Sequence, residues 1–170
     1  MTPSLTYNGT KVLWGKRSYK ATSGMQGYQL VSDQCLKDKG PVPEGLYKVF
    51  INDLGLAEDN GTNTCSLKPA WGIQTIPRNE LAGSCEPYWS NWGFHRARME
   101  PANNETKRKC NPIRGGFYLH DSTKGYSHGC IEVDTDLLSE LKNHSKRTGL
   151  NRLLLEVKYK GTTTYGKTDQ

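Results

Sequence analysis

The spacing of turn-forming residues restricts the fold of this chain more than any other sequence feature. The 170 residues include 18 glycines and 8 prolines, which divide the apolar positions into short runs. Asn8-Gly9, between two such runs, predicts a hairpin over residues 5–14, because these residues tolerate the positive φ angles of a tight turn. Residues 46–51 follow a Gly/Pro-rich turn and alternate between two faces, as a half-buried strand does. The pattern therefore predicts a mainly β, loop-rich fold.

One segment has the periodicity and end signals of a helix. Asp134 can cap its first turn and Gly149 can end its last turn. Between them lies a stripe of leucines, Leu137, Leu138 and Leu141. Further strands are expected at residues 18–23, 71–76, 115–120 and 150–160. We therefore predict a single domain over residues 1–160, in which one helix packs on a mainly β structure, followed by a flexible tail at 161–170.

Residues 77–113 are the longest stretch without clear periodicity. Connections of this length within a compact domain are uncommon and often cover a binding site. We interpret the stretch as a lid or insertion over the substrate, held by Cys85 and Cys110; a flexible surface loop is the alternative. Residues 52–70, which are polar and rich in turn formers, are expected to be a loop as well.

The cysteines and the charge bear on compartment and partners. If Cys130 is a reactive thiol, the other four cysteines can form two disulfides in any of three pairings: Cys35, Cys65, Cys85 and Cys110. Disulfides indicate an oxidising compartment, although the first residues lack the pattern of a signal peptide. No apolar run is long enough to span a membrane. The net charge of +6 suits an anionic partner, but the densest basic cluster, 107–109, is expected to be a solvated loop.

The residues around Cys130 carry the clearest chemical signal. A cysteine attacks a carbonyl as the thiolate, so it needs a nearby base or a positive potential. His120, at the end of a predicted strand, and His128, two residues before the cysteine, are the candidate bases. Two other interpretations stay open. One is an ordinary buried cysteine with surface histidines, and the other is a metal site that would need a further ligand, from Cys110 or Asp121.

The order of these residues resembles the signature of the L,D-transpeptidase (YkuD-type) family. His120 is followed, after six intervening residues, by the run Ser127-His128-Gly129-Cys130-Ile131. The resemblance implies a β-sandwich or β-barrel with one packed helix and a long loop insertion, and a cysteine enzyme that needs no metal or organic cofactor. Other segments resemble a small branch of the family that includes type VI secretion effectors: residues 23–24, 40–45, 92–93 and 115–120.

The resemblance also implies a role for each residue of the motif. His120 would deprotonate Cys130, and the thiolate would attack the carbonyl of the third residue of a peptidoglycan stem. The main-chain N–H groups of Gly129 and Cys130 would hold the oxyanion. Asp121 would orient the imidazole through its carbonyl or its carboxylate. The remaining motif residues, Ser127 and His128, would shape the pocket.

The chain departs from the family pattern at two points. His120 and Cys130 are ten positions apart, fewer than in the housekeeping enzymes, so the flap between them must be short. Glu132 stands where many members carry arginine or asparagine. This second departure puts in doubt the substrate contact made by that position in the family.

Substrate recognition is expected to involve cations, because a stem peptide ends in a free carboxylate that a guanidinium can bind with two hydrogen bonds. Arg96 and Arg98 share a face if residues 94–99 form a strand, and Arg114 precedes the predicted strand that ends at His120. Solvated surface charge is the alternative role for each of them. An aromatic residue next to a glycine can line the cleft. The expected substrate-binding residues are Arg96, Arg98, Arg114, Tyr118 and Trp92.

The expected partners are peptidoglycan stem peptides, with water, a free D-amino acid or a second stem as the acceptor. Together with the missing signal pattern, the resemblance predicts an antibacterial effector that is secreted by a non-Sec route. It would act in the periplasm of a target bacterium, and a cognate immunity protein would block it. The alternatives are a housekeeping cross-linking enzyme whose signal has been removed, a sortase-like or other cysteine peptidase, and a catalytically idle peptidoglycan-binding module. Neither nucleic acid binding nor membrane insertion is expected.

Overall fold

The computed structural model describes residues 3–169, which form ten strands and three α-helices. The strands are β1 (Leu5–Tyr7), β2 (Lys11–Trp14), β3 (Arg17–Ser23), β4 (Gly45–Phe50), β5 (Asp53–Leu56), β6 (Ile73–Thr75), β7 (His95–Pro101), β8 (Tyr118–His120), β9 (Ile131–Val133) and β10 (Arg152–Val157). The helices are α1 (Glu86–Trp89), α2 (Asn104–Lys107) and α3 (Thr135–Thr148). Three short 3-10 turns complete the elements: η1 (Val31–Asp33), η2 (Asn79–Leu81) and η3 (Gly83–Cys85).

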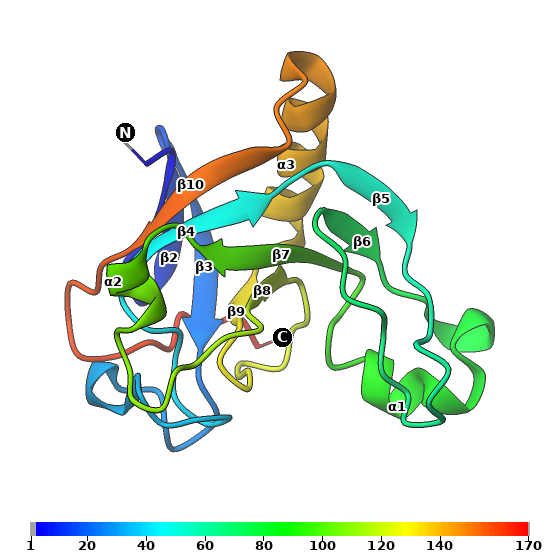
Figure 1. Ribbon diagram of the computed structural model, residues 1–170, viewed down its shortest axis with the longest axis horizontal. Helices are drawn as coiled ribbons and strands as arrows, with labels where there is room; N and C mark the ends of the chain where they lie inside the picture. Colours follow the sequence, from blue (N-terminus) through cyan, green and yellow to red (C-terminus); the bar gives the residue numbers. More distant parts are fainter. Residues whose placement is uncertain (1–2, 170) are drawn as a thin grey trace.

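Eight of the strands close into a barrel (Figure 1). Hydrogen-bonded neighbours follow the order β4-β10-β1-β2-β3-β9-β8-β7, and β7 also pairs with β4, which closes the ring. β1 is parallel to β10 and β8 is parallel to β9, whereas the other pairs in the ring are antiparallel. The predicted mainly β fold with one packed helix is therefore confirmed.

Alternating side chains of the strands fill the interior of the barrel. Tyr47 and Val49 of β4 point inward and are buried, as the alternation over residues 46–51 predicts. The predicted N-terminal hairpin is also confirmed, because Leu5 pairs with Trp14 across a turn. Burial of this alternating set is the main stabilising contribution to the barrel, at about 25 cal/mol for each Å² of apolar surface removed from water.

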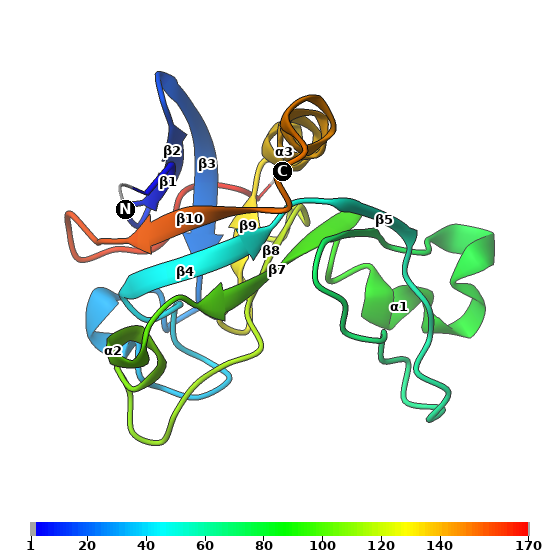
Figure 2. The ribbon, with the colours of Figure 1, turned by 45° about the horizontal axis from the view of Figure 1, so that its top comes forward.

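α3 packs against the barrel near β7 and β8, as Figure 2 shows from a second angle. Its three predicted leucines are fully buried. The side chain of Asp134 accepts a hydrogen bond at the start of the helix, and Gly149 ends it with a φ of 74°. The predicted helix is thus confirmed at both ends. Within residues 3–169, no helix combines the length and hydropathy needed to cross a membrane.

The two predicted long connections are partly wrong. Residues 52–70 contain the strand β5, which pairs with β6. Residues 77–113 are not one connection, because β7 crosses them as a strand of the barrel and pairs with β4, β6 and β8. β7 includes most of the strand considered for residues 94–99. Movement of any part of 77–113 over a substrate stays a prediction.

A small lobe extends from the barrel beyond β7 and contains β5, β6 and α1 (Figure 1). Its own apolar cluster includes Ile76 and Trp89. A disulfide joins Cys65 to Cys85 inside this lobe. The predicted pairing of Cys85 with Cys110 is therefore wrong: the two cysteines belong to different parts of the fold, and Cys110 is bonded to Cys35.

The C-terminal segment is ordered rather than frayed, so the predicted flexible tail is wrong for residues 161–169. Thr164 is fully buried, and its hydroxyl donates a 2.6 Å hydrogen bond to the carbonyl of Ser23. Thr168 is also buried, and its hydroxyl lies 2.9 Å from that of Thr22. Polar contacts with β3 hold this segment in place. Such contacts leave no hydrophobic periodicity in the sequence, so the sequence pattern did not indicate them.

Candidate active site

Cys130 and His120 lie on the same face of the paired strands β8 and β9. The strands run parallel, with Leu119 opposite Ile131 and His120 opposite Glu132. Leu119 and Ile131 are fully buried in the core of the barrel. Alternation therefore places Cys130, one residue before Ile131, on the other face together with His120. Strand pairing brings together the predicted nucleophile and the predicted base.

Two small cavities meet at Cys130. The first, which we call the Arg114 cavity, has a volume of about 230 Å³, and residues 113–117 form half of its lining. The second, the His120 cavity, has a volume of about 130 Å³ and includes the ring of His120 in its wall. Trp92, His128 and Cys130 line both cavities. Cys130 is partly exposed and can therefore be approached from two sides.

Both reacting groups are neutral near pH 7 in this structure. Burial lowers the pKa of His120 to about 4, because desolvation disfavours the imidazolium, and the nearby carboxylate of Asp121 only partly opposes this shift. Burial likewise raises the pKa of the Cys130 thiol to about 11, against an opposing effect of the Tyr118 main chain and of three arginines. The thiol therefore has to transfer its proton during the reaction, since the resting thiolate population is small.

This neutral resting state predicts a distinctive pH dependence of Cys130 alkylation. Since the pKa of about 11 lies far above neutral pH, the rate of iodoacetamide labelling should rise about tenfold per pH unit from pH 7 to 9, without a plateau. Intact-protein mass spectrometry under non-reducing conditions measures the rate. Cys130→Ala is the control and should take up no label, because the other four cysteines are in disulfides. A plateau below pH 9 would instead show a preformed thiolate.

Two serines hold the turn that precedes the nucleophile. The hydroxyl of Ser127 accepts a 3.1 Å hydrogen bond from the N–H of Gly24 and donates to the carbonyl of Cys130. The hydroxyl of Ser23 donates to the same carbonyl at 2.8 Å. The N–H of Gly129 is directed to Ser127 Oγ at 3.3 Å. The expected role of the Gly129 N–H in holding an oxyanion stays a prediction.

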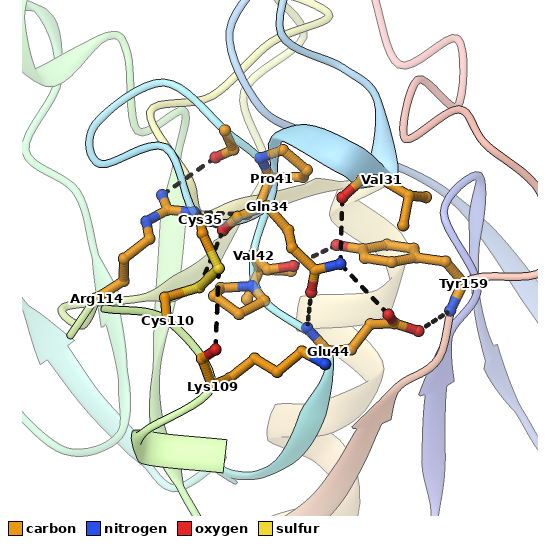
Figure 3. The surroundings of a disulfide bond; sticks show 12 residues. Val31, Gln34, Cys35, Pro41, Val42, Glu44, Lys109, Cys110, Arg114 and Tyr159 are labelled. Atoms are coloured by element: carbon orange, nitrogen blue, oxygen red, sulfur yellow. Dashed lines mark hydrogen bonds between the residues drawn. A yellow bond between two sulfur atoms is a disulfide. The ribbon is translucent and has the colours of Figure 1, made fainter. Parts of the chain in front are cut away.

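Arg114 lies beside this turn and binds the loop at 34–41, as Figure 3 shows for Gln34 and Pro41. Its guanidinium donates to the carbonyls of Gln34 and Pro41, both at 2.6 Å, and to that of Gly40 at 3.1 Å. Gly129 has a φ of 122°, and a Cβ atom there would lie only 2.4 Å from Arg114 Nη2. Only glycine therefore lets the turn lie against the guanidinium without displacing it.

The disulfide between Cys35 and Cys110 lies next to these contacts of Arg114 (Figure 3). It connects two loops 75 positions apart in the sequence, and both loops extend to the Arg114 cavity. We expect the double variant Cys35→Ser/Cys110→Ser to lower the free energy of unfolding by about 2–4 kcal/mol, because a long loop is no longer closed in the unfolded chain. Urea unfolding measures this loss.

The matched control for this prediction is Cys65→Ser/Cys85→Ser, which opens the loop of the small lobe, with a separation of only 20 residues. Loop-closure entropy depends on loop length, so this variant should lose less stability than the first. It should also leave the alkylation rate of Cys130 unchanged, since the cysteines of the lobe line neither cavity. Equal losses in both variants would contradict the loop-length argument.

Tyr118 lies between two of the arginines expected to bind substrate. The guanidinium carbons of Arg96 and Arg98 are 4.3 and 5.1 Å from the centre of its ring. Arg96 is 3% exposed and donates to Gln74 Oε1 (2.7 Å) and to a main-chain carbonyl (3.0 Å). Arg98 donates to Glu100 (2.8 Å) and to the hydroxyl of Tyr118 (3.1 Å). Arg96 and Arg98 share a face, as predicted, but acceptors within the protein already bind some of the N–H groups of each guanidinium.

Asp121 joins elements around the site. Its Oδ1 accepts the main-chain N–H groups of Phe94 (2.6 Å) and His95 (2.8 Å), and its Oδ2 lies 2.9 Å from His95 Nδ1 and accepts from Thr135 (2.8 Å). The carboxylate thereby connects the start of β7 to the start of α3. The imidazole of His120 contacts the hydroxyl of Ser122, the ring of Trp92 and the main chain of Trp92, which also hydrogen-bonds it.

Comparison with protein families identifies the class of this site. Residues 4–149 match the model of the YkuD family, the L,D-transpeptidase catalytic domain. The chain belongs to this family. The YkuD domain is a cysteine-dependent enzyme domain with a mainly β barrel, as predicted, and its family substrates are peptidoglycan stem peptides. A comparison with curated proteins found no match.

The YkuD site of this chain also contains residues that the sequence did not single out. Ser122 is 4% exposed, and its hydroxyl lies 3.1 Å from His120 Nδ1. Lys37 and Asp38 line the Arg114 cavity, and Lys124 lines the His120 cavity. Lys37 lies in the segment 31–40, and Ser122 and Lys124 lie in the loop 121–127. A single sequence does not reveal the course of these segments. Within residues 3–169, no group of three or more histidine, cysteine or acidic side chains is placed to hold a metal ion.

Proposed function

We propose that this L,D-transpeptidase domain cleaves the bond between the third residue and the terminal D-alanine of a peptidoglycan tetrapeptide stem, through a thioester on Cys130. The observation that carries the proposal is the position of Cys130 between two cavities, with His120 on the same face of the sheet. One cavity can take the acyl donor and the other can take the departing amine and then the acceptor. The family match supports the substrate class.

The reaction follows from the neutral resting state. His120 takes the thiol proton as Sγ of Cys130 bonds to the carbonyl carbon of the third residue, an L-centre. Collapse of the tetrahedral intermediate breaks the C–N bond, and the imidazolium of His120 returns its proton to the departing D-alanine amine. His120 then deprotonates the acceptor, which attacks the thioester carbonyl and breaks its C–S bond, and the imidazolium returns the proton to the released thiolate of Cys130. Water gives carboxypeptidase activity, a D-amino acid gives exchange, and a stem amine gives a cross-link.

The cations around the thiol support an anionic substrate and an anionic transition state. Arg96, Arg98 and Arg114 each lower the pKa of the Cys130 thiol, although burial outweighs them. Because part of each guanidinium is bound within the protein, we propose that they act mainly through their positive potential. A stem carboxylate that enters the site meets this potential at the floor of the site.

Mass analysis of muropeptides tests the proposed reaction. Purified protein is incubated with disaccharide tetrapeptides, alone and with D-methionine. We expect loss of the terminal D-alanine without an added acceptor and its replacement by methionine when D-methionine is present. A tripeptide muropeptide, which lacks the scissile bond, is the matched control. Unchanged masses for the tetrapeptide would contradict the proposal and favour an idle peptidoglycan-binding module.

We also propose that the enzyme works as an antibacterial effector in the periplasm of a target cell, where a cognate immunity protein protects the producer. Two observations support this proposal: the segments that resemble the effector branch of the family, and the two disulfides, which favour an oxidising compartment of action. A housekeeping role in cross-linking the cell wall is the alternative.

Expression in two compartments tests the effector proposal. The chain is produced in a heterologous bacterium with and without an added periplasmic signal, and growth is followed. We expect lysis or arrest only for the periplasmic form, and survival when Cys130 is replaced by alanine in that form. Normal growth with active enzyme in the periplasm would contradict the effector proposal and leave the proposed reaction intact.

A further inference from the structure

Glu132 is a buried carboxylate for which the reaction described above has no use. It is fully buried, and its oxygens contact four donors: the hydroxyl of Ser122, the N–H of Lys124 (3.0 Å), the N–H of Gly125 (2.8 Å) and the hydroxyl of Thr168. The two main-chain N–H groups can only donate, one to each carboxylate oxygen, and each of the two hydroxyls can donate its proton as well. The four contacts therefore fit an ionised Glu132.

Ser122 connects this carboxylate to the catalytic histidine. Its hydroxyl is bonded to Glu132 Oε2 and lies 3.1 Å from His120 Nδ1. A serine hydroxyl has one proton, and an ionised carboxylate can only accept. With an ionised Glu132, Ser122 donates to Glu132 and accepts from His120, which places the imidazole proton on Nδ1 and the lone pair on Nε2. The main chain of Trp92 also hydrogen-bonds the imidazole.

We propose that Ser122 and Glu132 are positioning residues that hold His120 as its Nδ1–H tautomer, so that Nε2 is the nitrogen that takes the proton of Cys130. The assignment of the tautomer rests on geometry alone. The role of Nε2 as the proton acceptor rests on the proposed function. The same connection stabilises the imidazolium formed during the reaction, because its Nδ1–H faces a hydroxyl backed by a negative charge.

The remaining contacts of Glu132 explain how a short flap can hold Ser122 in place. The N–H groups of Lys124 and Gly125 bind the carboxylate, which fixes the chain between His120 and Cys130. Thr168 brings the C-terminal segment to the same carboxylate. Glu132 thus joins the flap and the C-terminal segment, and an arginine or asparagine at this position would not offer four acceptor sites.

The protonation state of the imidazole tests the tautomer directly. In ¹⁵N-histidine-labelled protein at pH 7, NMR distinguishes a protonated from an unprotonated ring nitrogen, and His120→Gln identifies the signal. We expect His120 to be protonated on Nδ1 in the wild type, and Ser122→Ala to give a mixture of both tautomers. A wild-type signal with the proton on Nε2 would overturn the proposal.

Turnover of disaccharide tetrapeptide tests the functional part. We expect Ser122→Ala and Glu132→Gln to lower kcat by about 10- to 100-fold with little change in KM, since they act through His120 and not on the substrate. Ser122→Thr keeps the hydroxyl and should retain most of the wild-type kcat. Glu140→Gln is the matched control, because the carboxylate of Glu140 accepts from Arg17 and Tyr19 and lines neither cavity.

The two readouts separate the inference from the proposed function. A folded Ser122→Ala variant with wild-type tautomer and wild-type kcat would overturn the positioning role. An inactive wild type whose His120 still carries its proton on Nδ1 would contradict the proposed reaction, but it would support the tautomer assignment. Thermal unfolding of each variant shows whether a loss of kcat reflects a loss of folded protein.

Discussion

Replacing Cys130 with alanine is expected to reduce the release of D-alanine from tetrapeptide muropeptides by a factor of about 10⁴ or more. The variant lacks the only atom in the proposed reaction that bonds to the substrate carbonyl. The remaining site can bind a stem but cannot form a thioester. Liquid chromatography with mass detection of the muropeptides measures the rate. Turnover within tenfold of the wild type would show that another group is the nucleophile.

The fold of the Cys130→Ala variant should be unaffected, which makes the loss of activity easy to interpret. Cys130 is partly exposed, and it takes part in neither disulfide. Removing one sulfur atom at the junction of two cavities leaves the core of the barrel intact. We therefore expect the midpoint of thermal unfolding to stay within a few degrees of the wild-type value.

Replacing His120 with glutamine is expected to lower kcat/KM by about 10²–10⁴, the usual contribution of a general base. Glutamine retains a polar group of similar size but cannot take the thiol proton. His128→Gln is the matched control: His128 is exposed and lines both cavities, so its loss should change kcat/KM by less than about tenfold. Comparable losses in the two variants, or a larger loss in His128→Gln, would contradict the assignment of His120 as the base.

The parts of the fold with strong local signals could be predicted from the sequence. The hairpin at residues 5–14 has its turn signal between two apolar runs, and α3 has a cap, a leucine stripe and a terminal glycine. β5, in contrast, is exposed along its whole length and contains a glycine, so no alternation marks it as a strand. Its pairing with β6 depends on contacts across the fold.

The disulfides and the C-terminal segment required three-dimensional information. Four cysteines allow three pairings, and nothing in their spacing shows that Cys35 and Cys110 are neighbours. The segment from 161 to 169 has few apolar residues, and the hydroxyls of Thr164 and Thr168 hold it instead. Hydroxyl contacts of this kind have no periodicity for a sequence pattern to reveal.

The chemical centre of the site was predictable because its residues are close together in the sequence. A histidine at the end of one strand and a cysteine before the next become neighbours as soon as β8 and β9 pair in parallel. Glu132 was visible only as a departure from the family pattern. Its partners come from the flap and the C-terminal segment, so its connection to His120 through Ser122 appears only in the structure.

The mass of the peptide that contains Cys130, isolated during turnover, tests the central claim most directly. The enzyme is mixed with a disaccharide tetrapeptide, quenched in acid within seconds and digested for peptide mapping. We predict that Cys130 carries a thioester of the disaccharide tripeptide, formed with loss of D-alanine, and that hydroxylamine removes it. Rapid D-alanine release with unmodified Cys130, or with the acyl group on another residue, would contradict the account.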